Sequence, residues 1–505
     1  MNRQFIVKYL SVFTFSTILI LAFVVRTIQL QQVPAGFFCD EASIAYNAYE
    51  LLTTGRDEFG VAHPMFFQSF GDYKNPLFIY SAIPFIKLFG LTEFAVRFQS
   101  ALYGLITIVF LYLLAKEVFS RKAGLLSAFV ATTMPWLLHY NRIGFELNAY
   151  AAFFTAAIFL FIKGTKKKTY IIPAFIVSGF TLYTYQPPKL LVPLLLVGIG
   201  IIYWKQLFKH WRQVFLGFTI FLLMSVPLAL SFFTGEATAR FNDVSILSQH
   251  LPLDQTAQLF SKNYFAQLSP NYFIQGEDTP IERHFMNGLL PLLPVTIPFV
   301  VVGFIAAIIT FKKKFSQLLL YWLVLYPIAG AVTANPPFTG RSIIGAPLFV
   351  LLITYGIVVT VKLCKGFRAQ TILSMCVVLS IAANFVFFLQ FYFVQYPKQS
   401  ADFWGWQYGP RQMVSYFVAH EGEYDELIMS SYFNQPDIFI KFYAPHDCEK
   451  CRTGSLDSYN PALHQLFALP PKDIEDNPQF RYHVVKTIYY PNGSPAFILT
   501  EVHIK

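Results

Sequence analysis

The chain has little charge for its length. Asp, Glu, Lys and Arg make up 13% of its 505 residues, while hydrophobic residues make up 55%. Soluble globular domains carry roughly a quarter charged residues. The scarcity of charge therefore excludes an ordinary soluble protein and is typical of a polytopic membrane protein. The sequence also lacks internal repeats and low-complexity segments.

Long apolar runs occupy most of the first 395 residues. A helix that crosses a bilayer needs about 17–25 predominantly apolar residues. On this basis we predict about eleven membrane-spanning helices, although the third, sixth and ninth runs are short. The runs lie near 9–28, 94–115, 124–138, 147–162, 170–186, 190–204, 214–233, 288–311, 317–333, 343–361 and 371–395.

Acidic residues are almost absent from one set of the connecting segments. The N-terminus and the segments 116–122, 163–168, 205–212, 312–314 and 362–368 hold 18 of the 38 Lys and Arg residues, but only one of the 28 acidic residues, Glu117. Lys and Arg are enriched in cytoplasmic loops of membrane proteins. We therefore predict a cytoplasmic N-terminus and an extracytoplasmic C-terminus. The net charge of +10 then reports topology rather than binding to nucleic acid.

The segments expected outside are long. They include the loops 29–93 and 234–287 and a tail from 396 to 505, so we predict a transmembrane domain over 1–395 and a soluble module over 396–505. The module is large enough for a small core of its own. Short β-like runs, at Leu427–Tyr432, Ile438–Tyr443 and Tyr482–Tyr490, indicate a small α/β module.

The chain has only five cysteines. Cys448 and Cys451 form a C-x2-C motif in the predicted outer module. Zinc needs four ligands and only His446 is close by, so a local disulfide is favoured over a metal site.

An acidic pair, Asp40-Glu41, follows the first predicted span, and Lys74 lies in the same outer loop. Charges near hydrocarbon must stay hydrated or paired, which favours a functional role. The alternatives are a solvated loop, or helix capping by Asp40. Neighbouring helical side chains point about 100° apart, so only one of the two carboxylates should face a common cavity.

Three motifs on the predicted outer side carry a resemblance to a known family. The order of these motifs resembles integral-membrane glycosyltransferases of the GT-C class, which take sugar from a polyprenyl phosphate. More narrowly it resembles bacterial relatives of protein O-mannosyltransferases and of aminoarabinose transferases. The motifs are Asp72-Tyr73-Lys74-Asn75-Pro76-Leu77, then Tyr140-Asn141-Arg142 with Glu146, then Phe403-Trp404-Gly405-Trp406-Gln407-Tyr408-Gly409.

The resemblance implies a GT-C-like fold, and it implies roles for particular residues. Asp40 would be the catalytic carboxylate and Lys74 a contact to the donor phosphate, with Arg142 and Glu146 in the same cavity. Further candidates for catalysis or substrate binding are Glu41, Asp72, Tyr73 and Arg341. Aminoarabinose transferases carry an acidic metal-binding residue immediately before the lysine. Here Tyr73 stands at that position, which argues against a divalent metal, and no other cofactor is implied.

The chemistry favours sugar transfer independently of the resemblance. A lipid-phosphate sugar has a good leaving group, so the enzyme needs a base for the acceptor hydroxyl and cations for the phosphate. The partners expected are membrane lipids, a polyprenyl-phosphate sugar and a lipid, glycan or protein acceptor, at a bacterial plasma membrane. Two alternatives remain: a transporter or flippase of lipid-linked sugars, and a ligase or polymerase of surface glycans. Transporters often have paired repeats and midplane ligands.

Overall fold

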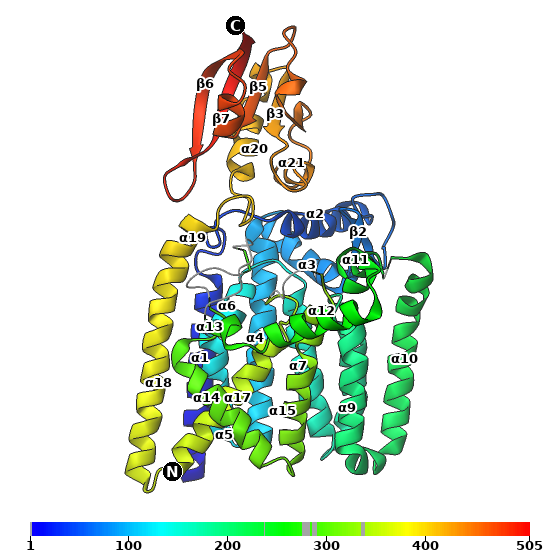
Figure 1. Cartoon of the computed structure of the whole chain (residues 1–505), viewed down its shortest axis with the longest axis vertical. Helices are drawn as coiled ribbons and strands as arrows, with labels where there is room; N and C mark the ends of the chain where they lie inside the picture. Colours follow the sequence, from blue (N-terminus) through cyan, green and yellow to red (C-terminus); the bar gives the residue numbers. More distant parts are fainter. Residues whose placement is uncertain (1–2, 237, 275–282, 285–289, 335–338) are drawn as a thin grey trace.

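The computed structural model describes residues 3–236, 238–274, 283–284, 290–334 and 339–505. An elongated helix bundle carries a small β-sheet module at one end (Figure 1). The longer helices of the bundle run roughly parallel to its long axis, and shorter helices lie across the end that faces the module. The N-terminus lies at the opposite end of the bundle from the module.

Each of the eleven predicted spans contains at least one helix, although residues 288 and 289 of the eighth span lie outside the described residues. In the part of the chain that the structure describes, seven helices are long and apolar enough to cross a membrane: α1, Arg3–Thr27; α4, Glu93–Val118; α7, Leu147–Gly164; α9, Pro188–Phe208; α10, Trp211–Thr234; α17, Gly345–Leu363; and α18, Phe367–Gln390, which extends to Gln399. The other four predicted spans fall on shorter helices: α5, Arg121–Thr133; α8, Ile171–Thr181; α14, Ile297–Ile309; and α15, Lys314–Leu325. Seven spans thus meet the length criterion, and the total of eleven crossings stays a prediction.

The apolar helices differ in how much of their surface the protein covers. In α7, 83% of the apolar window is buried, whereas in α1, α10 and α18 only 17–22% is. Apolar side chains such as Phe215, Phe233 and Phe387 are correspondingly exposed. Large contiguous apolar surfaces of this kind are stable only against lipid or another protein. The peripheral helices therefore present a lipid-facing surface, and α7 forms the centre of the bundle.

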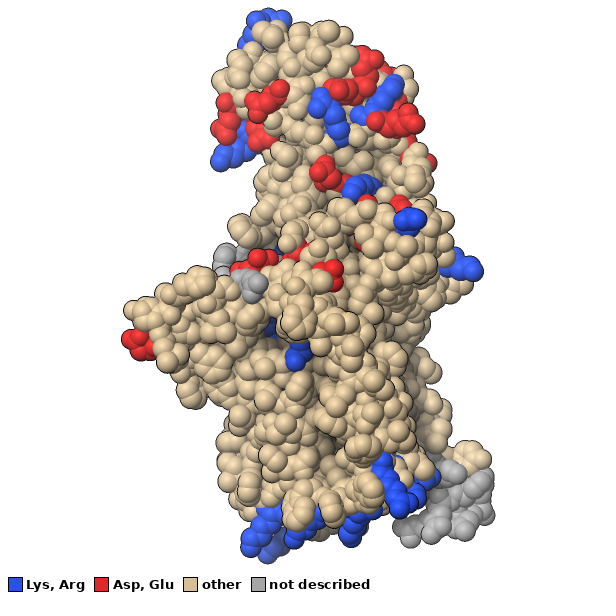
Figure 2. All heavy atoms as spheres, turned by 90° about the vertical axis from the view of Figure 1, so that its right-hand side faces the viewer, with Lys and Arg blue, Asp and Glu red and all other residues tan. Residues whose placement is uncertain are grey.

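Charge is separated along the long axis of the molecule. In Figure 2, Lys and Arg side chains gather at the end of the bundle away from the module, and Asp and Glu side chains gather on and near the module. The single acidic residue of the basic end, Glu117, binds Lys163 at 2.5 Å and Lys166 at 2.8 Å. The arrangement fits the positive-inside rule.

Short elements form a layer between the bundle and the module. The two apolar segments of the first long loop are helices, α2 (Cys39–Thr54) and α3 (Pro76–Phe89), joined through the hairpin β1 (Phe67–Ser69) and β2 (Asp72–Lys74). Figure 1 shows α2 lying across the top of the bundle. Other short α-helices of the chain are α6, Pro135–Tyr140; α11, Ala239–Val244; α12, Leu253–Ala266; α13, Pro270–Ile274; α16, Ile328–Ala331; and α19, Tyr396–Gln399.

The C-terminal module is a mixed five-stranded sheet with three short helices, as predicted for an α/β module. The sheet order is β4-β3-β5-β7-β6, with β3 parallel to β4 and β5, and β7 antiparallel to β5 and β6. The elements are α20, Pro410–Ala419; β3, Glu426–Ser430; α21, Asp437–Tyr443; β4, Cys451–Gly454; β5, Gln465–Leu469; α22, Pro471–Glu475; β6, Phe480–Tyr489; and β7, Pro495–Ile504. Cys448 and Cys451 form the predicted disulfide.

One predicted strand of the module is wrong. The run Ile438–Tyr443 lies in helix α21 rather than in a strand. Its aromatic and β-branched residues favour a strand, but Ile438, Phe439 and Phe442 are the buried ones. That spacing is one face of a helix. Tertiary packing of this face therefore outweighed the intrinsic preference of the run.

Candidate active site

The first turn of α2 positions Asp40. The N-cap of this helix is Phe38, and Asp40 is already its second residue, so the alternative role of Asp40 as the helix cap is excluded. Acidic groups in a first helical turn interact favourably with the helix dipole. Oδ1 of Asp40 lies 2.6 Å from Nζ of Lys74, and the Asp40 side chain is 39% exposed. The carboxylate is thus paired and still accessible.

Lys74 and Glu146 complete a cluster with Asp40. Lys74 is the last residue of β2, and Glu146 immediately precedes α7, where its Oε1 accepts a hydrogen bond from the backbone N–H of Asn75 at 3.1 Å. Burial disfavours the charge of Lys74, but Asp40 and Glu146 outweigh burial and raise its pKa. Burial raises the pKa of Glu146 to about 7, although the charge of Lys74 opposes this. The charge of Asp72 contributes to both pKa shifts.

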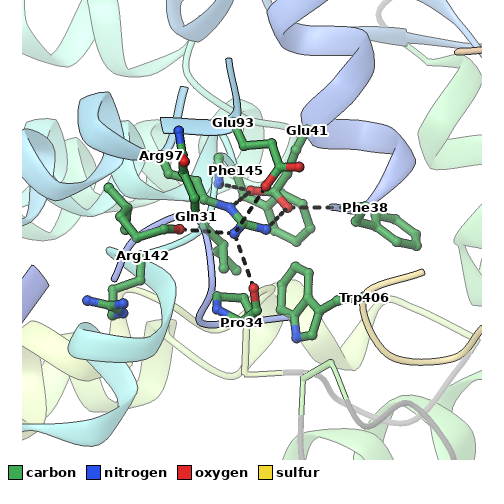
Figure 3. A network of polar contacts seen from close by, with 12 residues as sticks. Gln31, Pro34, Phe38, Glu41, Glu93, Arg97, Arg142, Phe145 and Trp406 are labelled. Atoms are coloured by element: carbon green, nitrogen blue, oxygen red, sulfur yellow. Dashed lines mark hydrogen bonds and ion pairs between the residues drawn. The ribbon is translucent and has the colours of Figure 1, made fainter. Parts of the chain in front are cut away.

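Glu41 has a different environment from Asp40. Its side chain is fully buried and accepts hydrogen bonds from Nε and Nη2 of Arg97, at 2.9 and 3.0 Å. The backbone N–H groups of Phe38 and Gly144 also donate to it, at 3.3 and 2.7 Å. Figure 3 shows Arg97 pointing between Glu41 and the carbonyl group of Pro34. With its oxygens used in this way, Glu41 fixes the start of α2, and Asp40 is the carboxylate that keeps an exposed side chain.

Arg142 binds the chain segment that leads into α2. It is fully buried, and its guanidinium donates to the backbone carbonyls of Val25, Ile28, Gln29 and Val33, at 2.7–3.3 Å. The structure therefore does not bring Arg142 to the Asp40 cluster, where the family resemblance would place a substrate contact.

Arg283 is a cation close to the cluster. Its guanidinium carbon lies 3.6 Å from the ring centroid of Phe38, and Nη1 donates to the carbonyls of Trp404 and Gly405, at 3.2 and 3.0 Å. Burial lowers the pKa of Arg283, while the charge of Asp40 opposes this. Arg341, the other predicted cation, lies close enough to His284 to act on it: burial lowers the pKa of His284 most, and the charge of Arg341 adds to the effect.

The aromatic motif after the last long helix packs against the site. The indole of Trp406 is fully buried and donates to the Tyr396 hydroxyl at 2.7 Å. The side-chain oxygen of Gln407 accepts from the backbone N–H of Cys39 at 3.3 Å. At Gly36, with φ +94°, a Cβ would lie 2.3 Å from the carbonyl oxygen of Trp406. Only glycine allows this close approach, so the aromatic motif packs against the segment that leads to Asp40.

Sequence reasoning missed several residues of this region. Arg97 lies inside a predicted span, and a charge at such a position is itself a signal of a site. Its neighbour Glu93 binds Arg411 of α20 and accepts a hydrogen bond from Tyr443 of α21. The C-terminal module is therefore bound to α4, the helix whose Arg97 binds Glu41. Lys189, at the start of α9, lies 5.2 Å from the ring centroid of Phe66.

Tyr73, another predicted site residue, contacts the segment that leads into α9 through its backbone: its carbonyl oxygen accepts a hydrogen bond from the side chain of Gln186 at 3.1 Å. Among the residues that the structure describes, no group of three or more His, Cys, Asp or Glu side chains is arranged to hold a metal ion. The chemistry that the cluster can perform is therefore argued from its carboxylates and cations.

Comparisons with known proteins bear on this fold. A family model described as dolichyl-phosphate-mannose-protein mannosyltransferase matches residues 73–230, less than half of the chain. No curated protein matches the sequence significantly. ArnT from Cupriavidus metallidurans is similar in structure in the apo state, with 13% identity, a TM-score of 0.59 and 98% of each chain covered. ArnT bound to undecaprenyl phosphate gives 13% identity, a TM-score of 0.58 and 97% of each chain.

The oligosaccharyltransferase of Archaeoglobus fulgidus in the apo form is also similar, with 13% identity and a TM-score of 0.57. The match covers 86% of this chain but only 64% of the archaeal one. The matched part of the family model contains Lys74 and Glu146. The family match and the fold support the predicted membrane glycosyltransferase over the transporter alternative. The chain is an integral multi-pass membrane protein with the GT-C-like fold of ArnT and the archaeal oligosaccharyltransferase, as its sequence predicted.

Proposed function

We propose that this protein transfers a sugar from a polyprenyl phosphate to an acceptor hydroxyl on the extracytoplasmic side of the membrane. The observation that carries the proposal is the ion pair of Asp40 and Lys74, with Glu146 beside it, at the end of the bundle nearest the module. An accessible carboxylate and a buried ammonium at this position are the two groups that such a reaction requires.

In the proposed reaction, Asp40 takes the proton of the acceptor hydroxyl. The hydroxyl oxygen forms a bond to the anomeric carbon of the sugar as the bond from that carbon to the phosphate oxygen breaks. The polyprenyl phosphate leaves as an anion. Lys74, which faces Asp40 at 2.6 Å, neutralises the charge that builds on the phosphate. Charge-assisted hydrogen bonds of this kind are about twice as strong as neutral ones.

The protonation of Glu146 matters for the donor. A second ionised carboxylate in the cluster, beside Asp40, would add to the repulsion of the phosphate. Since burial raises the pKa of Glu146 to about 7, a substantial fraction is neutral near neutral pH. We infer that Glu146 limits this repulsion and stays available as a second proton acceptor.

An apolar cavity offers a place for the lipid chain of the donor. It has a volume of about 300 Å³ and is lined by residues of α12 and its neighbours, among them Ile246, Leu253 and Phe260. Helix α11 precedes α12 in the chain and packs against β2, the strand that carries Lys74. ArnT has been crystallised with undecaprenyl phosphate, and the archaeal oligosaccharyltransferase AglB with a dolichol-phosphate. A polyprenyl phosphate is therefore the donor class that we propose.

The proposed reaction needs the module end to face away from the cytoplasm. We infer a cytoplasmic N-terminus from the 18-to-1 division of basic and acidic residues. We infer a bacterial plasma membrane from the similarity to ArnT of Cupriavidus metallidurans. Single cysteines placed in the module of a cysteine-free variant should react with a membrane-impermeant thiol reagent in intact cells. Labelling of the module only after lysis would contradict the proposed orientation.

The direct test of function is transfer by the purified protein in lipid nanodiscs. Radiolabelled undecaprenyl-phosphate sugars are supplied as a panel, and the release of unlabelled undecaprenyl phosphate is measured together with label in an acceptor fraction. Membrane extracts provide lipid, glycan and protein acceptors. Release that depends on Asp40 and on added acceptor supports the proposal. No release with any sugar of the panel would refute it.

A further inference from the structure

A second cavity lies between the first outer loop and the C-terminal module. Its volume is about 250 Å³. One wall is formed by the loop, with Phe59, Gln68 and Phe70, and the other by the start of α21, with Gln435, Asp437 and Lys441. Figure 1 shows α21 at the lower edge of the module, above α2. We refer to this cavity as the module cleft.

The module cleft reaches the proposed catalytic pair through a single side chain. Phe70 lines the cleft, and Nζ of Lys74 lies 5.0 Å from the centroid of its ring. The same Nζ is 2.6 Å from Asp40. A molecule that rests against Phe70 is thus separated from the ion pair by no more than that ring.

The backbone at Phe70 is strained because this bulky residue has a positive φ angle. Phe70 and Gly71 form the two-residue turn between β1 and β2, with φ values of +55° and +85°. Turns of this type strongly prefer Asn or Asp before the glycine. A bulky residue with positive φ costs about 1–2 kcal/mol. Since Asn would serve the turn better, the ring at this position points to a contact outside the turn.

The two walls are held at a fixed separation. Nζ of Lys441 binds Oε2 of Glu58 at 3.2 Å across the cleft, and the Glu58 side chain is only 4% exposed. Asn47 of α2 donates to the other oxygen of Glu58 at 2.9 Å. The cleft is therefore a preformed space between two tied elements, which is the usual state of a ligand site.

The side chains of the cleft match a molecule rich in hydroxyl groups. A hydroxyl both donates and accepts hydrogen bonds. The two amides, Gln68 and Gln435, also do both, while Asp437 accepts and Lys441 donates. Phe59 and Phe70 add apolar ring faces, against which the C–H face of a sugar can pack.

We propose that the module cleft binds the acceptor, and that the acceptor is a carbohydrate whose hydroxyl reaches Asp40 past Phe70. The inference rests on the proposed glycosyltransferase function and adds the class of the acceptor to it. A peptide with serine or threonine is the competing acceptor class.

The test measures binding of defined probes to the full-length protein in nanodiscs. Saturation-transfer NMR is recorded with a panel of glucose, galactose, mannose and N-acetylglucosamine disaccharides at millimolar concentration, and with an alanine-threonine peptide. The wild type should transfer saturation to at least one disaccharide. Gln435→Ala should weaken that binding roughly fivefold to tenfold, the loss expected for one hydrogen bond.

Phe70→Asn is the critical variant, because it removes the ring and relieves the turn. Its thermal unfolding temperature should equal or exceed that of the wild type, while disaccharide binding is lost. Gln479→Ala, at an exposed glutamine of the same module outside the cleft, is the matched control and should bind as the wild type does. Disaccharide binding that is absent in the wild type, or equal in Phe70→Asn, overturns the inference. Binding of the peptide that depends on Phe70 also overturns it.

Failure of the inference and failure of the proposed function can be distinguished. Release of undecaprenyl phosphate without disaccharide binding refutes the carbohydrate acceptor and leaves the transferase. Disaccharide binding that depends on Phe70, without release from any donor, supports the cleft as a carbohydrate site and refutes the transferase.

Discussion

Replacing Asp40 with asparagine tests whether its carboxylate acts as a base. Phe38, not Asp40, is the N-cap of α2, so the substitution leaves the cap unchanged. The cost to folding has two parts. Loss of the charge near the helix N-terminus costs about 0.3–1 kcal/mol. The side chain of Asp40 is 39% exposed, so solvent screening limits the contribution of its ion pair with Lys74 to at most about 1 kcal/mol. We expect Asp40→Asn to destabilise the protein by no more than about 2 kcal/mol.

The effect on catalysis should be much larger. Asparagine keeps an oxygen that can accept from Lys74 but cannot take a proton. Loss of general-base catalysis lowers rates by roughly 10²–10⁴, which corresponds to about 3–5 kcal/mol in the barrier. Initial rates of sugar transfer are measured with saturating donor, next to thermal unfolding and undecaprenyl phosphate binding of the same sample. A wild-type rate in Asp40→Asn would refute the assignment, and Glu146→Gln, assayed in parallel, would then identify the alternative base.

Three further predictions follow from the same contacts. Lys74→Ala should weaken binding of undecaprenyl phosphate by roughly tenfold or more, the loss of one charged hydrogen bond, and unchanged affinity in a binding titration would contradict the phosphate contact. Arg97→Met should destabilise the protein by about 3–5 kcal/mol because it leaves Glu41 buried without its partner, and adding Glu41→Gln should recover part of the loss in thermal unfolding. Because the pKa of Glu146 is raised to about 7, the folded state binds its proton more tightly than the unfolded state does. The unfolding temperature should therefore fall as the pH rises from 4.5 to 7. Glu146→Gln should make this fall smaller, and an unchanged fall in the variant would argue against the raised pKa.

The sequence predicted the parts of the fold that depend on composition and local order. Hydropathy located a helix at each of the eleven apolar runs, and the order of motifs anticipated the GT-C-like fold. It also named Asp40, Lys74 and Glu146, which the structure brings together.

The parts that could not be predicted depend on tertiary contacts. Arg142 and Glu146 lie four residues apart, yet Arg142 binds backbone carbonyls near the end of α1 while Glu146 faces Lys74. Nothing in the local sequence tells a guanidinium that binds carbonyl groups from one that binds a phosphate. In the same way, the division of roles between Asp40 and Glu41 was expected from helix geometry, but only the position of Arg97 decides which carboxylate is buried.

The buried arginines explain how the carboxylate in the first turn of α2 can be held with the precision of a catalytic group. The chain between α1 and α2 has no regular structure of its own, but Arg142 binds its first carbonyl groups, and Arg97 binds those of Leu30, Pro34 and Gly36 at 2.7–3.2 Å. Because Arg97 also binds Glu41, it joins this segment to the start of α2. Catalytic side chains work best when surrounding groups fix them in advance. The backbone at Asp40 is held in place because the residue next to it in the chain, Glu41, is anchored by four hydrogen bonds.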